Sequence, residues 1–74
     1  MKELVRISNL TSHADILKIR SIVSDYEGVL ACEINLNKKE VHLVYDKLSV
    51  SIDEIINAIE MAGYLVIWYI NYRK

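Results

Sequence analysis

The feature that most constrains this chain is the order in which its hydrophobic period changes. Val5 and Ile7 alternate with polar neighbours, and this period of two predicts a half-buried strand. The period then becomes helical. One apolar stripe over three turns is formed by Ile16, Ile19, Ile22, Val23 and Tyr26. Gly28 follows, at a place where the end of a helix favours a residue that tolerates positive φ. The chain is therefore predicted to begin with a strand and a helix.

Two strands joined by a hairpin are predicted next. Residues 31–36 alternate again, with Cys32, Ile34 and Leu36 on one face. Residues 37–40 are polar and form the connection. One face of the following strand is formed by Val41, Leu43 and Tyr45.

A second helix and a last strand complete the pattern. Ser51 and Glu54 have the spacing of a capping box, with Ser51 as the N-cap. The buried stripe of this helix is predicted to be Ile52, Ile55, Ile56, Ile59 and Ala62. Gly63 ends the helix, and residues 64–72 form a strand in which only Asn71 lies outside the apolar set.

The predicted order is strand, helix, strand, strand, helix, strand. Two such halves interleave into one four-stranded antiparallel sheet with both helices on one face, which is the α+β ferredoxin-like (βαββαβ) sandwich. A chain of 74 residues has room for one domain, so we assign residues 1–74 to a single domain. Fold alone does not give a function.

Composition argues against several classes of function. Nine basic and ten acidic side chains give a net charge of −1, so there is no basic field to hold nucleic acid. The single cysteine excludes an intramolecular disulfide and a zinc site built from several cysteines, and it points to a reducing, cytoplasmic location. The longest uncharged stretch, residues 61–72, is shorter than the roughly 20 residues that span a bilayer, so no membrane insertion by this segment is expected.

A set of core and turn residues resembles a known family through its joint spacing. It covers residues 4–68 and consists of Ile19, Gly28-Val29, Ile34-Asn35-Leu36, Val41, Tyr45-Asp46, Ile55, Ala58-Ile59 and Ala62-Gly63-Tyr64. The chain is similar to the heavy-metal-associated domain. Members of that family include small copper chaperones, the periplasmic mercury-binding protein and the N-terminal modules of metal-transporting P-type ATPases. The resemblance implies the ferredoxin-like fold and a context of metal transport.

The family's metal-binding signature is Gly-Met-Thr-Cys-x-x-Cys, and this chain departs from it. In the corresponding stretch, Leu10 takes the place of the Met and Thr11 is retained. Ser12 and Asp15 stand where the resemblance places the two cysteines, and Tyr64 is expected beside this loop. Soft ions such as copper(I) are selected by thiolate sulfur, whereas a hydroxyl is a poor ligand and a carboxylate suits hard cations. The soft-metal site that the family implies is therefore expected to be absent.

Two interpretations of this loop remain. Ser12 and Asp15 also have the spacing of a capping box, in which Asp15 faces the positive end of the helix dipole. The alternative is a degenerate metal site of Ser12, His13 and Asp15 that binds a divalent ion weakly, because these side chains supply few ligands. No other cofactor is expected.

The remaining polar residues form no catalytic constellation, so we do not expect an enzyme. His42 alternates away from the core face of its strand, which argues against a site shared with His13. Cys32 lies on the core face, where a buried thiol behaves as a small, inert hydrophobic residue.

The last strand carries apolar residues on both faces. If Val66, Trp68 and Ile70 point to the helices, as the resemblance suggests, an outward row is formed by Leu65, Ile67 and Tyr69. An apolar row on an exposed sheet face, at an edge strand, is a candidate contact surface. It predicts a protein partner, a neighbouring domain or a weak homodimer.

Two functions follow from these residues. The first is a non-catalytic docking or regulatory module that has lost its soft-metal site, such as the N-terminal domain of a metal-transporting P-type ATPase. The alternative is a protein that binds or traffics metal ions with altered ligands around His13 and Asp15.

Overall fold

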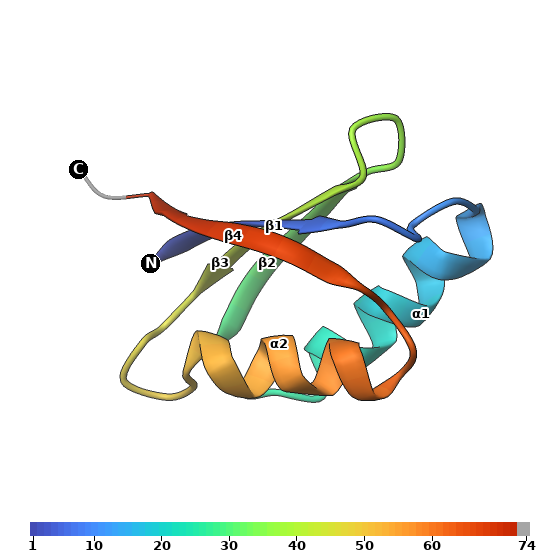
Figure 1. The fold of residues 1–74 in the computed structure, drawn as a ribbon. Helices are drawn as coiled ribbons and strands as arrows, with labels where there is room; N and C mark the ends of the chain where they lie inside the picture. The colour runs from blue at the N-terminus through green and yellow to red at the C-terminus, as the bar shows by residue number, and fades with distance from the viewer. Residues whose placement is uncertain (73–74) are drawn as a thin grey trace.

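The computed structural model describes the backbone of residues 1–72 and the side chains of residues 1–67. Its elements are β1 (Lys2–Ile7), α1 (His13–Ser24), β2 (Val29–Asn35), β3 (Glu40–Tyr45), α2 (Ile52–Met61) and β4 (Val66–Tyr72). Figure 1 shows both helices on the same face of the sheet. The predicted ferredoxin-like βαββαβ fold is confirmed. In the described part of the chain, no helix has the length and apolarity that a membrane crossing requires.

The four strands form one antiparallel sheet in the order β2-β3-β1-β4, so β2 and β4 are its edges. Both outer pairings contain an irregularity. The register of β1 with β4 shifts between Arg6 and Ile7, and that of β2 with β3 shifts between Val29 and Ala31. Such a shift re-aims the residues that follow it.

The core lies between the sheet and the helices, as the hydrophobic periods predict. Ile19 and Val23 are the buried residues of α1, and α2 contributes Ile55, Ile56 and Ile59. The sheet and loops supply the other residues of this core cluster, Val5, Ile7, Leu10, Val41, Leu43, Tyr45, Val50 and Tyr64. The remaining residues of the predicted helical stripes that pack against this cluster are half-buried; they are Ile22, Tyr26, Ile52 and Ala62.

The edge position of β2 corrects one prediction. Cys32, Ile34 and Leu36 do share the core face, but each is only half-buried. An edge strand has a neighbour on one side alone, so its core-facing side chains stay partly open to solvent. Cys32 is therefore not the fully buried thiol that the alternation predicted.

The two helix N-termini differ, and this corrects a second prediction. α1 has a complete capping box on Ser12. In α2, the Ser51 hydroxyl accepts a hydrogen bond from the Glu54 backbone N–H at 3.3 Å. Among the described contacts, the Glu54 carboxylate does not accept the hydrogen bond from the Ser51 backbone N–H that would complete a capping box. Glu54 is exposed, and hydration of its carboxylate competes with this hydrogen bond to the Ser51 backbone.

Candidate functional site

The loop between β1 and α1 lies against the loop between α2 and β4, at the end of the molecule on the right in Figure 1. The side-chain amide of Asn9 joins the two loops. Its Nδ2 donates to the carbonyl of Gly63 at 3.0 Å, and its Oδ1 accepts from the N–H of Leu65 at 2.8 Å. The N–H of Ser8 donates to the Leu65 carbonyl at 2.9 Å. These bonds fix the two loops relative to each other.

Leu10 anchors the loop between β1 and α1 in the hydrophobic core. It is fully buried in the core cluster, at the position where the resemblance places a Met. The next residue, Thr11, is exposed, so the chain passes from the core to the surface just before α1 begins.

Asp15 organises the start of α1. Its Oδ2 accepts hydrogen bonds from the backbone N–H groups of Thr11 at 3.0 Å and Ser12 at 3.1 Å, and from the Thr11 hydroxyl at 3.3 Å. The Ser12 hydroxyl in turn accepts from the Asp15 N–H at 3.3 Å. The capping-box interpretation of Ser12 and Asp15 is confirmed.

The other oxygen of Asp15 is held from the second loop. The hydroxyl of Tyr64 donates to Asp15 Oδ1 at 2.8 Å. Tyr64 is positioned by the end of α2, where Gly63 has a φ of +101°. The N–H of Gly63 donates to the Glu60 carbonyl and that of Tyr64 to the Ile59 carbonyl, which is the Schellman motif. The end of α2 and the start of α1 are thus connected through one phenol and one carboxylate.

These contacts set the charge state of the pair. The backbone N–H of Thr11 and the hydroxyl of Tyr64 lower the pKa of Asp15 to about 2. Burial, together with the Asp15 acceptor, raises the pKa of Tyr64 to about 12. Around neutral pH, the carboxylate is ionised and the phenol keeps its proton. Lys18 lies over the Tyr64 ring, with Nζ 6.0 Å from the centroid, and adds a positive charge beside the pair.

The two histidines do not join this network. His13 is the exposed first residue of α1. His42 is on β3, where its Nε2 lies 3.3 Å from Oε1 of Glu40. Within the part of the chain that the structure describes, no three His, Cys, Asp or Glu side chains gather closely enough to hold a metal ion.

Two parts of this site escaped sequence reasoning. The Asn9 clamp has no local signature, because an amide in a polar loop is ordinary. The Tyr64–Asp15 bond joins residues 49 positions apart. The resemblance placed Tyr64 beside the loop, and the phenol next to an acidic residue was the available signal.

The predicted contact row is only partly within the described side chains. Leu65 and Ile67 are 63% and 55% exposed. The side chain of Tyr69 lies outside the described residues, as do those of Trp68 and Ile70. The prediction assumes that side chains from Leu65 to Tyr69 alternate regularly between the two faces of the sheet. The register of β1 with β4, however, shifts between Arg6 and Ile7.

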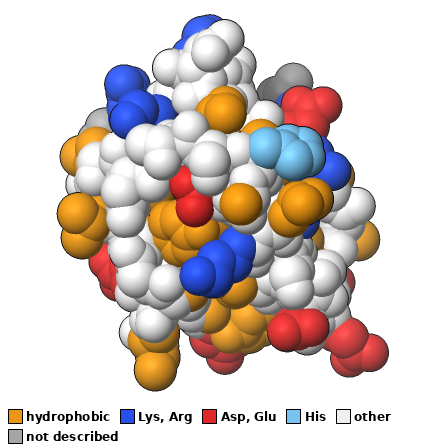
Figure 2. All heavy atoms as spheres, turned by 90° about the vertical axis from the view of Figure 1, so that its right-hand side faces the viewer, with side chains coloured by type: hydrophobic (Ala, Val, Ile, Leu, Met, Phe, Trp, Pro, Cys, Tyr) orange, Lys and Arg blue, Asp and Glu red, His pale blue; other side chains and the backbone are white. Residues whose placement is uncertain are grey.

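Figure 2 shows the loop end of the molecule, where apolar side chains gather around a basic and an acidic one.

Comparison with solved structures finds the same fold in several proteins, among them a metallochaperone and a copper-binding domain of a P-type ATPase. A CopZ metallochaperone shares 24% identity and a TM-score of 0.86, over 90% of this chain and 100% of that chain. Apo-CopP from Helicobacter pylori shares 28% identity and a TM-score of 0.81, over 90% and 100%. A copper-binding domain from HMA7, a P-type ATPase, shares 22% identity and a TM-score of 0.78, over 92% and 100%.

Comparison with curated proteins gives no match. The family model of the heavy-metal-associated domain matches residues 4–64, which span β1 through the Tyr64 loop. The chain therefore belongs to the heavy-metal-associated domain family.

Proposed function

We propose that this heavy-metal-associated domain lacks the soft-metal thiolate site and acts as a docking or regulatory module. Domains of this family are non-catalytic, so its function is one of binding. The observation that carries the proposal is the use of Ser12 and Asp15. Both carboxylate oxygens of Asp15 and the hydroxyl of Ser12 take part in hydrogen bonds within the chain. A metal ion would have to displace those bonds, and it would gain only oxygen ligands.

The placement that we propose for the module is the N-terminal region of a metal-transporting P-type ATPase. One similar structure is a copper-binding domain from a P-type ATPase, and it has the size of this chain, because it is covered in full. In such a setting, the domain would contact neighbouring domains through its surface.

The absence of a soft-metal site is tested by titration with copper(I) in competition with a chelator of known affinity. We expect no stoichiometric capture by the domain, since neither loop position carries sulfur and Cys32 lies on β2. Cys32→Ser is the matched control, because it removes the remaining thiol without touching the loop. Capture of one copper(I) ion by the unmodified domain, unchanged in Cys32→Ser, would contradict the proposal.

The alternative function is metal binding or trafficking with altered ligands. The exposure of His13, two positions before Asp15, is the observation that favours it. Addition of zinc followed by amide NMR distinguishes the two functions. Saturable shifts around residues 11–15 that are abolished by His13→Ala would support the alternative, also where they need a high zinc concentration. The absence of saturable shifts there, or shifts unchanged in His13→Ala, would support the docking module.

The docking surface that we propose is the row Leu65, Ile67 and Tyr69 at the edge strand β4. Ile67→Lys should leave the fold intact and abolish self-association or docking, because a charge in an apolar contact must be desolvated. Leu48→Lys is the control, since Leu48 is 90% exposed in the loop before α2. Sedimentation velocity at high protein concentration is the measurement. A domain that stays monomeric and is indifferent to Ile67→Lys would show that the row does not mediate self-association.

A further inference from the structure

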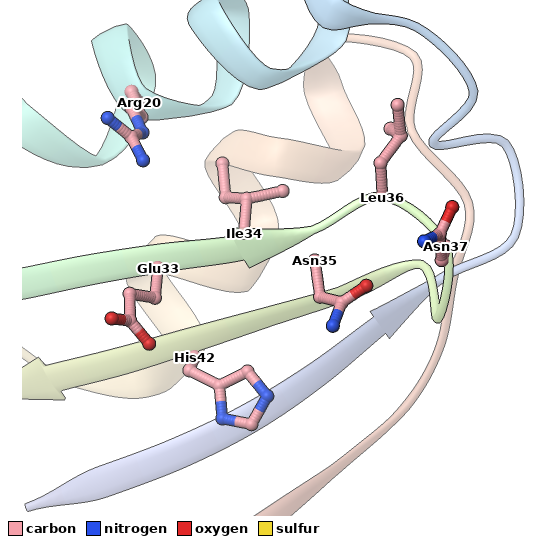
Figure 3. A pocket seen from close by; sticks show the side chains of 7 residues that line it. All are labelled: Arg20, Glu33, Ile34, Asn35, Leu36, Asn37 and His42. Atoms are coloured by element: carbon pink, nitrogen blue, oxygen red, sulfur yellow. The ribbon is translucent and has the colours of Figure 1, made fainter.

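The free edge of β2 carries a groove that the candidate site does not use. The groove follows the β2 edge, is lined by Arg20 of α1, residues 33–37 and His42 of β3, and has a volume of about 460 Å³. Figure 3 shows Arg20 extending from α1 into the space beside β2, while Ile34 and Leu36 point from the β2 side toward the helix. Glu33 and His42 lie on the opposite side of the strand.

The backbone of β2 is open to another strand along this groove. Among the described strands, only β3 pairs with β2, so the polar groups on its other edge have no strand partner there. The register shift between Val29 and Ala31 interrupts the regular strand near its start. Regular pairing of an added strand is therefore confined to residues 31–35 and the start of the hairpin.

Apolar side chains recur at every second residue beside this edge, and charged side chains lie close to them. Cys32, Ile34 and Leu36 are half-buried and form an apolar strip on the helix side. Arg20 makes no ion pair or hydrogen bond among the described residues. Figure 3 shows Arg20 toward the Glu33–Ile34 part of β2 and away from Leu36. Burial raises the pKa of the Cys32 thiol, and the charge of Arg20 opposes this. On the other face, Glu33 is exposed.

We propose that the edge of β2 docks an extended segment of a partner protein as a fifth strand. An acidic side chain of that segment pairs with Arg20, and apolar side chains two and four positions away cover Ile34 and Leu36. A basic side chain between them faces Glu33. Backbone hydrogen bonds supply affinity, and the alternating charges supply specificity.

A second copy of this chain fits the edge less well. A two-fold axis centred on this stretch would bring Arg20 and Glu33 close to their own symmetry mates. Like charges placed opposite each other destabilise a strand pair. The proposed surface lies on the opposite edge of the sheet from β4, so it goes beyond the docking row described above and is tested independently of it.

The test is an amide NMR titration with the blocked peptide Thr-Asp-Lys-Val-Thr-Val-Thr and with its reversed sequence, which samples the other strand direction. We expect one of them to shift residues 31–36 and the Arg20 side of α1. Arg20→Glu should weaken that binding at least tenfold, and replacing the peptide's Asp by Lys should restore it. Lys47→Glu, an equal charge change in an exposed loop, should have no effect.

Three results would overturn the proposal. They are the absence of shifts with either peptide at millimolar concentration, shifts centred on residues 9–15 and 62–67, and equal affinity in Arg20→Glu. Concentration-dependent shifts of residues 31–36 without peptide would assign the edge to a second copy of the chain, and would overturn the proposed partner.

Discussion

Asp15 illustrates how a single residue can order a loop through hydrogen bonds within the chain. In a Cys-x-x-Cys loop, two thiolates can be joined through an ion that both of them bind. Here one oxygen of the Asp15 carboxylate accepts hydrogen bonds from backbone N–H groups at the start of α1. The other oxygen accepts a hydrogen bond from the Tyr64 hydroxyl in the second loop. The bond from Tyr64 is charge-assisted, which makes it stronger than a bond between neutral groups. The same end of the fold is thus connected by hydrogen bonds within the chain.

This connection predicts how stability depends on pH. The pKa of Asp15, about 2, lies below its ordinary value, so its contribution is complete above about pH 5 and lost as the pH falls toward 2. The pKa of Tyr64, about 12, lies above its ordinary value, so its contribution is complete below about pH 10 and lost as the pH rises through 12.

Tyr64→Phe tests both windows, because it keeps the ring and removes the hydroxyl. The pKa of Asp15 should rise toward its ordinary value, the acid loss of stability should become smaller, and the loss above pH 10 due to residue 64 should disappear. Carboxyl NMR titration and denaturant unfolding across the two ranges are the measurements. Tyr26→Phe, at the far end of α1, is the control. An unchanged pKa of Asp15 in Tyr64→Phe would exclude the hydrogen bond in solution.

At the scale of elements, the hydrophobic periods predicted all six helices and strands but not the details that depend on tertiary neighbours. Strand periodicity shows which residues share a face, and it does not show that β2 lies at an edge and leaves Cys32 half-buried. The spacing of Ser51 and Glu54 permits a capping box without forcing the carboxylate to return. The register shift beside Ile7 depends on how β1 and β4 meet.

The two glycines after the helices provide a matched prediction for their loops. Gly28 and Gly63 both have φ near +100°, so alanine at either position costs about 1–2 kcal/mol in backbone strain. A Cβ on Gly63 would meet no atom within 4 Å, whereas one on Gly28 would lie 2.7 Å from the Cβ of Ser49. Gly28→Ala should therefore destabilise the domain more than Gly63→Ala does. Denaturant unfolding measures the two costs, and equal costs would contradict the close approach to Ser49.

Gly63→Ala should have a further effect that Gly28→Ala lacks. It strains the turn that positions Tyr64, so the pKa of Asp15 should rise in Gly63→Ala alone. The same carboxyl titration shows this difference. Equal pKa values of Asp15 in the two variants would show that Tyr64 does not depend on the end of α2 for its position.

At the scale of the whole molecule, the position of the candidate site was predictable and its internal chemistry was not. The signature spacing located residues 9–15, the capping box and the buried Leu10. The contacts of Asn9 and Tyr64 join segments more than 45 residues apart, and only the closed fold brings them together. The chain shares the overall fold of its solved relatives, so cysteines can be placed at the two loop positions that we propose have lost their thiolates.

Ser12→Cys with Asp15→Cys should create copper(I) binding in a domain that, by our proposal, has none, because two thiolates suit this ion and the fold that carries the loop is retained. The metal-free variant should be less stable. Removal of the Ser12 cap costs about 1 kcal/mol, and loss of the Asp15 bonds to Thr11 and Tyr64 adds to it. Copper(I) should then raise the melting temperature, and the stabilisation should grow with the logarithm of the ratio of free copper(I) to its dissociation constant.

Ser12→Ala with Asp15→Ala separates the two effects of that double change. It removes the same cap and the same bonds without adding sulfur, so it should match the metal-free loss of stability and remain indifferent to copper(I). Competition with a chelator and thermal unfolding of both variants are the measurements. A folded double-cysteine variant that captures no copper(I) would show that the loop geometry no longer brings two thiolates onto one ion.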